Sequence, residues 1–369
     1  MEFKPRSVCI HGVGLLGGSI GAALKESGYS GGIIGLSSPA TIASALALGI
    51  IDEGFGYDRL PEVIGRIDCL FLCAPIAVIM KTLEQLGNLA LPQGLLITDV
   101  GSTKSQINAC ARGALPSSVT FIGGHPMAGS EKNGVAASDP FLFQNAMYML
   151  TPPVGAPGPG VAGFGEFLER YLGCRTLSVE SDEHDSIVAA VSHVPHMLAV
   201  ALVNLAEGED RLRPGTLKLA AGGFRDMTRI AAAPFGMWRD ILMTNKKAIS
   251  SLLDTYIGLV KDMQAALAAD GLEGPFEAAA KTRREIPTGN KGFIHPQSDI
   301  LVVAKDQPGI IARMSSALAA ENINIKDIEV LKVREGEAGT IRLAFARKEQ
   351  ALSAVAVLTA AGFTARERD

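Results

Sequence analysis

Cysteines are few in this sequence, and long apolar runs are missing. The five cysteines are odd in number, none forms a C-x-x-C pair, and three lie inside strand-like segments. This argues against a disulfide framework and indicates reduced core thiols in a cytoplasmic protein. The longest apolar stretch, residues 69–80, is too short to span a bilayer and contains Pro75. No basic segment followed by an apolar run opens the chain, so we expect neither a secretory signal nor a membrane span.

An excess of charge of one sign is also lacking. The formal net charge is −4, the pI is near 5.9, and no basic tract occurs. We therefore expect neither nucleic acid nor an anionic membrane as a partner. The chain has 369 residues, of which 47% are hydrophobic and 20% charged. That composition and length indicate an ordinary globular protein with two or three domains.

Strand and helix patterns divide the chain into three domains and a linker. In residues 1–180 short apolar strands alternate with helical segments, which predicts an α/β, Rossmann-like domain whose parallel sheet is covered on both faces. Residues 181–284 predict an all-helical second domain, with one long helix over residues 238–269. Residues 285–298 predict a linker, and residues 299–369 follow the βαββαβ order of a ferredoxin-like domain.

A glycine-rich turn follows the first predicted strand, residues 7–10, and opens a helix. Its spacing is Gly12-x-Gly14-x-x-Gly17. The first glycine permits the tight turn, the second lets a pyrophosphate approach the backbone, and the third lets the helix pack on the strand. Free N–H groups at the helix N-terminus then face the phosphates. We expect a dinucleotide at Gly12, Gly14, Leu15, Leu16 and Gly17.

The end of the second predicted strand, residues 32–36, bears on which dinucleotide is bound. An acidic side chain there would hold a ribose 2′-hydroxyl, and an arginine would pair with a 2′-phosphate. The sequence instead places Ser37 and Ser38 after the strand. A serine hydroxyl can bond either group, so NAD and NADP both stay open. The lack of a cationic clamp favours NAD.

Four further motifs follow in order: Asp99-Val-Gly-Ser-Thr-Lys104, Gly124-His-Pro-Met-Ala-Gly-Ser-Glu131, Ser192-His-Val-Pro-His196 and Gly222-Gly-Phe-Arg-Asp-Met-Thr-Arg229. At these residues the chain resembles the prephenate/arogenate dehydrogenase family, over roughly residues 6–285. Residues 305–309 separately resemble the ACT-type amino-acid-binding domain, which some members of that family carry at this place. The resemblance implies NAD(P)-dependent oxidative decarboxylation of prephenate to 4-hydroxyphenylpyruvate in tyrosine biosynthesis, or of arogenate to tyrosine.

That chemistry needs a base for the 4-hydroxyl proton, because the ketone-like centre forms only as this proton leaves. His125, just past a strand end, is the candidate, since an imidazole accepts a proton at neutral pH. A turn histidine held by Pro126 is the structural alternative. By resemblance the hydroxyl of Ser102 orients both the substrate and the base. A helix N-cap is the alternative for Ser102 or Thr103.

The two carboxylates of such a substrate require cations or hydrogen-bond donors. Arg229 is the candidate for a bidentate contact. Asp226 lies three residues earlier, so on a helix the two share a face and can pair. A surface ion pair is the structural alternative. The resemblance implies that Glu131 joins them as a gate over the pocket.

Two more contacts follow from the resemblance. His196 would reach the side-chain end of the substrate, and Gly222 would let the backbone approach it. His193 and His196 have the spacing of half a metal site, but no third ligand occurs at a suitable distance in the sequence, so we expect no metal. For Trp238, the single tryptophan, core packing and a place near the pocket or the dimer seam both stay open. A homodimer through the helical domain is expected by resemblance.

The C-terminal module points to regulation. In an ACT-like domain a loop caps the first helix and shapes an effector site between paired domains; the corresponding residues are Asp306, Gln307, Pro308 and Gly309, with Asn322 and Asn324 at the next loop and strand. Tyrosine, the pathway product, is the expected effector. Feedback inhibition requires that tyrosine favour one of two states of the enzyme. A module used only for dimerisation is the alternative.

Two rival interpretations have distinct signatures. A β-hydroxyacid-type dehydrogenase would use a catalytic lysine in the helical domain, where Lys246 and Lys247 occur. The Gly-His-Pro-Met-Ala-Gly motif is not part of that pattern. A non-catalytic amino-acid sensor that kept the nucleotide fold is the other rival. Intact candidates for the base, the orienting serine and the carboxylate clamp argue against it.

Overall fold

The protein is represented by a computed structural model, which describes residues 3–129, 132–153, 159–286, 298–305, 307–332 and 338–368. The chain separates into two compact units, Met1–Ala269 and Asp270–Asp369. This division differs from the boundary expected near residue 284, and the three-domain division stays a prediction. Apart from its ends, the linker expected at residues 285–298 lies outside the described residues.

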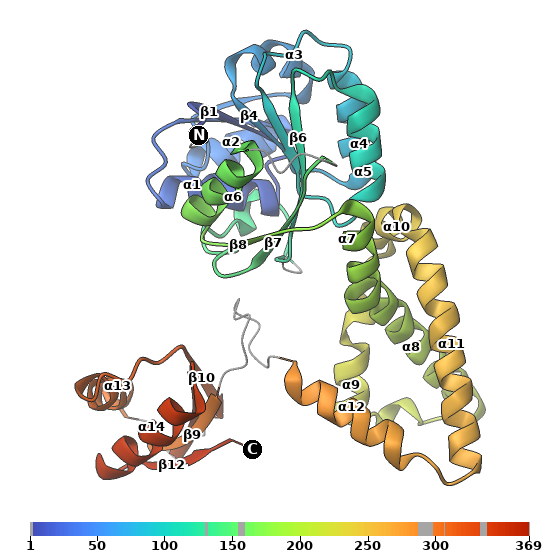
Figure 1. Ribbon diagram of the computed structural model, residues 1–369, viewed down its shortest axis with the longest axis vertical. Coiled ribbons are helices and arrows are strands. Elements are labelled where there is room, and N and C mark those ends of the chain that lie inside the picture. The colour runs from blue at the N-terminus through green and yellow to red at the C-terminus, as the bar shows by residue number, and fades with distance from the viewer. Residues whose placement is uncertain are drawn as a thin grey trace. The chain divides into compact units, whose positions relative to one another are not determined.

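An eight-stranded sheet forms the centre of the first unit, in the order β3-β2-β1-β4-β5-β6-β7-β8 (Figure 1). Neighbouring strands run parallel, except that β6 and β7 pair antiparallel. The predicted Rossmann-like α/β fold is confirmed. The strands are β1 (Ser7–His11), β2 (Gly32–Leu36), β3 (Glu53–Phe55), β4 (Cys69–Leu72), β5 (Leu96–Asp99), β6 (Thr120–Pro126), β7 (Met147–Thr151) and β8 (Arg175–Ser178).

Helices cover both faces of this sheet, and this burial explains the apolar runs of its central strands. Successive side chains of a strand point to opposite faces. Val8 and Ile10 therefore pack with α1 and α6, whereas Cys9 between them packs with α3, α4 and α5. The covering helices are α1 (Leu15–Glu26), α2 (Pro39–Ala47), α3 (Leu60–Val63), α4 (Ile76–Leu86), α5 (Ser105–Ala114) and α6 (Pro159–Leu172) (Figure 1).

The glycine turn between β1 and α1 has three glycines in three environments. Gly12 has a φ of +99°, and a Cβ there would lie 2.3 Å from the carbonyl oxygen of Cys73. A Cβ on Gly17 would lie 2.1 Å from the carbonyl oxygen of Gly12. A Cβ on Gly14 would meet nothing within 4 Å. Gly12 and Gly17 are thus required by the fold, whereas Gly14 keeps open space beside the backbone.

The remainder of the first unit is helical. Its main helices are α7 (Ser181–Val188), α8 (Val194–Leu212), α9 (Gly222–Thr228), α10 (Phe235–Thr244) and α11 (Lys246–Ala268). A π-helical turn, Ala189–His193, joins α7 to α8. Pro195 accounts for it, because a proline lacks the N–H that would continue the regular hydrogen-bond ladder to Val191.

The single helix predicted over residues 238–269 is wrong, since the structure divides it into α10 and α11 at Asn245. The backbone of Asn245 has φ −114° and ψ 22°, outside the helical range. Its side-chain amide donates to the carbonyl oxygen of Asp185 at 2.7 Å and lies 3.1 Å from Nδ1 of His193. These tertiary hydrogen bonds explain the break, which apolar periodicity does not reveal.

The helical part exposes much apolar surface. The continuous stretch Ser181–Leu212 is long and apolar enough to cross a membrane by length and composition, a test that core helices of soluble proteins also pass. Exposed apolar side chains that gather into a patch mark a contact face. Large exposed side chains include Leu205, Leu212, Leu219, Phe235, Met237, Ile257, Leu259, Met263 and Leu267.

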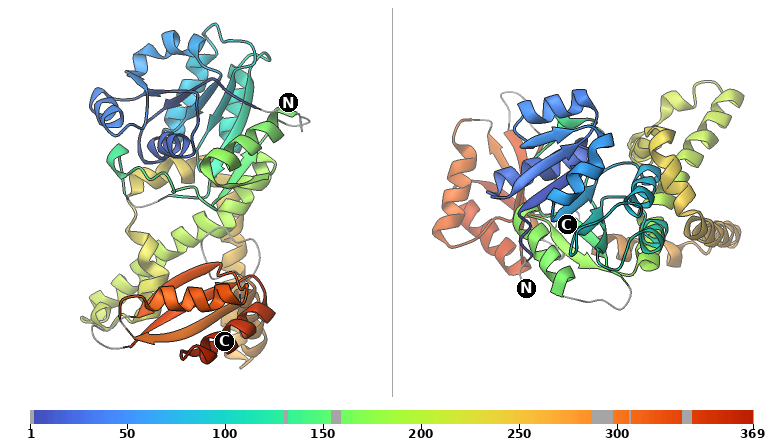
Figure 2. Two further views of the ribbon diagram at one scale, coloured as in Figure 1. Left: turned by 90° about the vertical axis from the view of Figure 1, so that its left-hand side faces the viewer. Right: turned by 90° about the horizontal axis from the view of Figure 1, so that it is seen from above.

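The second unit contains α12 (Glu273–Glu285) and a four-stranded antiparallel sheet in the order β10-β11-β9-β12. Two helices, α13 and α14, cover one face of this sheet (Figure 2). The predicted βαββαβ order is confirmed. Its elements are β9 (Ser298–Lys305), α13 (Ile310–Ala320), β10 (Asp327–Lys332), β11 (Ala338–Phe345), α14 (Lys348–Ala360) and β12 (Thr364–Glu367).

The second strand of this order, β10, begins at Asp327. Asn322 has a φ of +57°, the left-handed conformation that asparagine tolerates, and it reverses the chain after α13. One buried arginine then ties three strands together. Arg342 on β11 donates to Asp299 on β9 and to Asp327 and Glu329 on β10.

Substituting alanine at Gly17 tests the turn. The added methyl meets backbone rather than a flexible side chain, so we expect Gly17→Ala to lower the free energy of unfolding by about 1–3 kcal/mol. Gly14→Ala is the matched control and should cost less than about 1 kcal/mol, because the space is open. Denaturant unfolding of the two variants measures both. Equal free energies of unfolding for Gly17→Ala and Gly14→Ala would contradict the close approach of Gly17 to the carbonyl oxygen of Gly12.

Candidate active site

A buried ion pair joins the carboxyl ends of β5 and β6. The side chains of Asp99 and Lys104 are both 0% exposed and bonded to each other. Asp99 also accepts the N–H groups of Gly101, at 2.8 Å, and Gly124, at 3.1 Å. Lys104 donates to the carbonyl oxygen of Gly124 at 2.7 Å. Both backbone groups of Gly124 are thus held, which fixes the position of His125 after it.

His125 lies within β6, which extends to Pro126, rather than just past the end of the strand as predicted. Its Nδ1 is 2.9 Å from Nε2 of His184, and Nδ1 of His184 is 2.9 Å from Oδ1 of Asp185. Burial, followed by the charges of His184, Lys104 and His193, holds the pKa of His125 well below its usual value. The ring is therefore neutral at physiological pH and able to accept a proton.

Ser102 shares one cavity with His125. The cavity has a volume of about 280 Å³ and is lined by Ser102, His125, Pro126, Met127, Ala128, Gly129, Ser192, His193, Trp238 and Ile241. The N-cap alternative for Ser102 and Thr103 is wrong, because α5 begins at Ser105 without a side-chain cap from its own N-terminus. Asp185 of α7 instead accepts the backbone N–H groups of Lys104, at 2.7 Å, and Ser105, at 2.9 Å.

A larger cavity adjoins the first and shares Ser192 and Trp238 with it. Its volume is about 730 Å³, and both His196 and Arg229 line it. His196, only 6% exposed, stacks on Trp238 with ring centroids 3.7 Å apart. The lone tryptophan therefore lies between the two cavities. The structure brings the predicted base, orienting serine, arginine and distal histidine into one joined region.

Two predicted substrate contacts are not brought there. Gly222 and Asp226 lie exposed on α9 and line neither cavity. Asp226 lies on α9, which ends at Thr228, whereas Arg229 begins a 3₁₀ turn, so the two residues do not share one α-helix as predicted. Glu131 lies outside the described residues.

The two histidines of the 192–196 segment do not converge on a common point. His193 is hydrogen-bonded to Asn245, and burial lowers its pKa to about 4. His196 stacks on Trp238 instead. Within the described part of the chain, no group of three or more potential ligands is arranged to hold a metal ion.

The glycine turn borders a further cavity, of about 180 Å³, at the ends of β1 and β2. Its lining includes Gly12, Gly14, Ser37, Thr41 and Tyr57. Leu15, Leu16 and Gly17 form the first turn of α1 beside it. The open space at Gly14 and the free N–H groups of this turn suit a pyrophosphate.

One of the two predicted serines, Ser37, lines this cavity. Ser37 Oγ lies 3.3 Å from the hydroxyl of Tyr57. Ser38 caps α2 and accepts the N–H of Thr41 at 3.4 Å. The donors present fit a dinucleotide; β2 ends on Leu36, and none of the described residues that line this cavity is acidic.

Sequence reasoning missed His184, Asp185 and Asn245. His184 and Asp185 sit in Ser-Asp-Glu-His-Asp-Ser, which has the composition of an exposed, acidic first helical turn. In the structure His184 is 0% exposed and Asp185 4%. The only signal in the chain was a run of polar residues at an expected domain boundary. Their partners lie up to 81 positions away in the sequence, so local patterning could not identify them.

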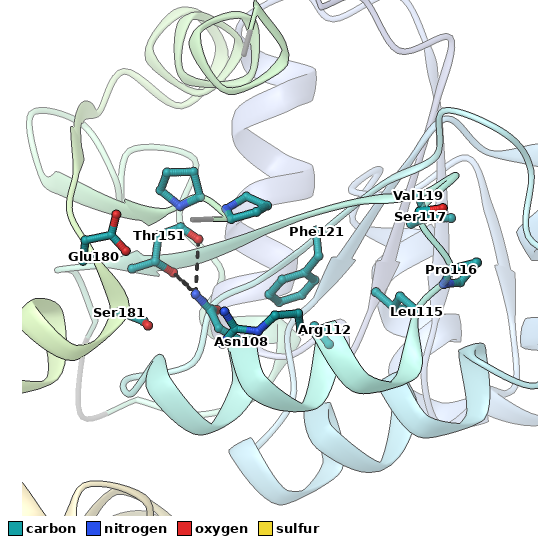
Figure 3. A pocket seen from close by; sticks show the side chains of 13 residues that line it. Asn108, Arg112, Leu115, Pro116, Ser117, Val119, Phe121, Thr151, Glu180 and Ser181 are labelled. Atoms are coloured by element: carbon teal, nitrogen blue, oxygen red, sulfur yellow. Dashed lines mark hydrogen bonds between the residues drawn. The ribbon is translucent and has the colours of Figure 1, made fainter. Parts of the chain in front are cut away.

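A separate cavity of about 330 Å³ lies beside α5 and the end of β7 (Figure 3). Asn108 and Thr151 line it, and the Asn108 amide donates to the Thr151 hydroxyl at 3.0 Å; Phe121 and Arg112 also line it. Of the predicted site residues that the structure describes, none lines this cavity. It is not part of the region around His125.

Comparison with known proteins gives a consistent result. Residues 20–173 match the nucleotide-binding domain of prephenate dehydrogenase, residues 180–278 its dimerization domain, and residues 298–355 the ACT domain. Prephenate dehydrogenase of Bacillus subtilis is 36% identical over 343 residues, 92% of each chain.

Two solved structures are also similar. A. aeolicus prephenate dehydrogenase, in complex with hydroxyphenyl propionate and NAD+, is 29% identical with a TM-score of 0.68, covering 75% of this chain and 96% of that one. Synechocystis arogenate dehydrogenase is 29% identical with a TM-score of 0.66, covering 75% and 97%.

Removing Lys104 tests the buried ion pair. Lys104→Met leaves the carboxylate of Asp99 buried without its cation, so we expect the free energy of unfolding to fall by about 3–5 kcal/mol. The double variant Asp99→Asn, Lys104→Met removes both charges and should recover part of this loss. Urea unfolding of the wild type, the single variants Lys104→Met and Asp99→Asn, and the double variant gives the coupling energy between the two side chains. A coupling near zero would show that the pair does not hold β5 and β6 together.

Proposed function

Because the chain belongs to the prephenate dehydrogenase family, we propose that it catalyses the NAD(P)-dependent oxidative decarboxylation of prephenate to 4-hydroxyphenylpyruvate in tyrosine biosynthesis. It is an oxidoreductase with a Rossmann-like domain and a C-terminal ACT domain. One observation carries the proposal most directly. A neutral, half-buried histidine at the end of a Rossmann strand shares a cavity with Ser102, and that cavity adjoins one lined by an arginine.

His125 is proposed as the base. Its Nδ1 is engaged with His184, so Nε2 is the ring nitrogen available to the cavity. Nε2 would take the proton of the 4-hydroxyl as the ring loses its carboxylate and becomes aromatic. Ser102, in the same cavity, would hold the hydroxyl in line with the base. Burial keeps the imidazole neutral before the reaction, so it is ready to accept this proton.

NAD, when bound, accepts the hydride from the ring carbon that carries the 4-hydroxyl. Gly12, Gly14 and Ser37 line the cavity proposed to hold it. Leu15, Leu16 and Gly17 would offer the N-terminal turn of α1 to the pyrophosphate. Ser37 and Ser38 would contact the ribose. We propose a preference for NAD over NADP, because none of the described residues that line this cavity is an arginine or lysine that could pair with a 2′-phosphate.

The substrate carboxylates need cationic partners. Arg229 is proposed to bind one of them, and His196, held flat against Trp238, to reach the side-chain end. Asp226, Gly222 and Glu131 complete the proposed set as a gate and a backbone contact. Asp226 and Gly222 would need a substrate or a second subunit to approach α9, since they line neither cavity.

Arogenate is the second candidate substrate. The similarity to Synechocystis arogenate dehydrogenase, at 29% identity, favours keeping it. The two substrates differ in the keto or amino group of the side chain. Residues of the larger cavity, which His196 and Arg229 line, would distinguish the keto group from the amino group.

We further propose a cytoplasmic homodimer that is inhibited by tyrosine. The exposed apolar side chains of α8, α10 and α11 suit a dimer seam, and residues 180–278 match a dimerization domain. The effector site would use the loop that opens α13 and the turn that ends it, where Gly309 and Asn322 both adopt left-handed backbone. The proposed residues are Asp306, which lies outside the described residues, with Gln307, Pro308, Gly309, Asn322 and Asn324.

Absorbance at 340 nm tests the function directly. Prephenate or arogenate is crossed with NAD or NADP, with and without tyrosine. We expect reduction with prephenate and NAD, and a lower rate when tyrosine is present. Phenylalanine serves as the effector control. Reduction with no pairing, by pure folded protein, would refute the proposed reaction, and an unchanged rate with tyrosine would refute the proposed inhibition.

His125→Ala tests the base. We expect turnover to fall by about 10²- to 10⁴-fold, the usual contribution of a positioned base, or roughly 3–5 kcal/mol of transition-state stabilisation. Steady-state kinetics at saturating NAD and substrate measure it. Arg229→Ala is the comparison, because loss of a carboxylate contact should chiefly raise the KM for substrate. Near wild-type turnover in His125→Ala would remove this histidine from the mechanism.

A further inference from the structure

Three side chains behind the cavity are hydrogen-bonded end to end: His125, His184 and Asp185. Both links are 2.9 Å long, from His125 Nδ1 to His184 Nε2 and from His184 Nδ1 to Asp185 Oδ1. We propose that His184 is a positioning residue for the reaction: it fixes the tautomer of His125 and takes over the proton that His125 removes from the substrate. This inference rests on the proposed function.

The tautomers follow from Asp185. Its carboxylate accepts the N–H groups of Lys104 and Ser105 as well as His184. Burial raises the pKa of this carboxyl, but the hydrogen bonds from His184 and Ser105 outweigh burial and hold it below the usual value. An ionised carboxylate has no proton to donate, so His184 must carry its proton on Nδ1. Nε2 of His184 is then a lone-pair acceptor.

The same logic extends to His125. Since His184 Nε2 accepts, His125 must carry its proton on Nδ1, which leaves the lone pair on Nε2. When Nε2 takes the hydroxyl proton, the Nδ1 proton can cross the 2.9 Å hydrogen bond to His184 Nε2. His125 is then neutral again, with one proton on Nε2. His184 is protonated on both nitrogens, with Asp185 beside it as counter-ion.

The charges around His125 explain why this transfer helps. Burial disfavours a charged imidazole there, and the facing groups His184, Lys104 and His193 oppose it further, while Asp185 is the facing group that favours it. Lys104 is itself paired with Asp99. Moving the positive charge from His125 to His184 therefore brings it into direct contact with a carboxylate. His184 is 0% exposed, so the proton leaves as it came, through His125 to water once the product has gone.

A purely structural histidine is the competing explanation. Asp185 also caps α5, so replacing it would disturb folding whatever its chemical role. His184 is the cleaner target. Glutamine at this position can still accept the Nδ1–H of His125 through its amide oxygen, but it cannot take a proton. The variant His184→Gln thus keeps the hydrogen bond that orients the His125 ring but removes the group that can accept its proton.

We expect His184→Gln in the full-length enzyme to lower kcat by about tenfold or more, the lower part of the range for proton-transfer groups. The acid limb of the kcat/KM profile should move to lower pH by about half a unit or more, because the positive charge is no longer shared and His125 becomes the weaker base. KM for NAD should stay unchanged. In the wild type, kcat should depend on the deuterium fraction of the solvent along a curve, because more than one proton moves. In His184→Gln this dependence should be linear, because only one proton moves.

His11→Gln is the matched control, since it removes an equally buried histidine that lies outside this hydrogen-bonded chain. We expect its acid limb to stay in place. A His184→Gln enzyme with the wild-type pH profile and turnover would overturn the relay. A fall in kcat with an unmoved acid limb and an unchanged solvent isotope effect would assign His184 a structural role only, which also overturns it.

A second measurement needs neither turnover nor a stable variant. Long-range ¹H–¹⁵N spectra of the wild-type chain labelled in its six histidines report which nitrogen of each ring carries the proton. We expect the proton on Nδ1 for both His125 and His184. A proton on Nε2 of His125 would overturn the proposal. If the wild type reduces neither cofactor, the proposed function fails, while the spectra still decide the tautomers.

Discussion

The ion pair between Asp99 and Lys104 is the interaction on which the rest of the site depends. It lies where β5 and β6 end, with neither side chain exposed, and it holds both backbone groups of Gly124. Buried ion pairs add little net stability, because desolvation offsets much of the attraction. Their value here is geometric: the pair sets where β6 delivers His125. A Cβ on Gly124 would lie 2.6 Å from the carbonyl oxygen of Asp99, so this contact also requires glycine.

Around this ion pair, hydrogen bonds between different helices and strands position the other polar side chains. Asp185 of α7 caps α5, and Asn245, at the break between α10 and α11, bonds both the backbone of Asp185 and the ring of His193. Burying so many polar groups is tolerable because they satisfy one another's hydrogen bonds. The network joins the Rossmann-like sheet to the helices of the same unit, and the two cavities open beside it.

Burial also sets the chemistry of the histidines. It lowers the pKa of His11 and His193 to about 4 and holds that of His125 well below its usual value. Near neutral pH these rings are acceptors or fixed donors rather than cations. A base in such surroundings is available at every physiological pH but holds a proton poorly. A neighbouring histidine and carboxylate can then stabilise the proton that such a base takes up.

The sequence by itself determined the layers and the motifs. Alternating apolar strands and helices predicted the Rossmann-like sheet, the glycine spacing predicted the turn, and the βαββαβ order predicted the C-terminal fold, because these features depend on local periodicity and backbone conformation. Only the tertiary structure decided that α10 and α11 separate at Asn245, that Asp185 rather than Ser102 or Thr103 caps α5, and that His184 lies behind His125. Those outcomes depend on contacts between residues 59 to 81 positions apart, and no local pattern records them.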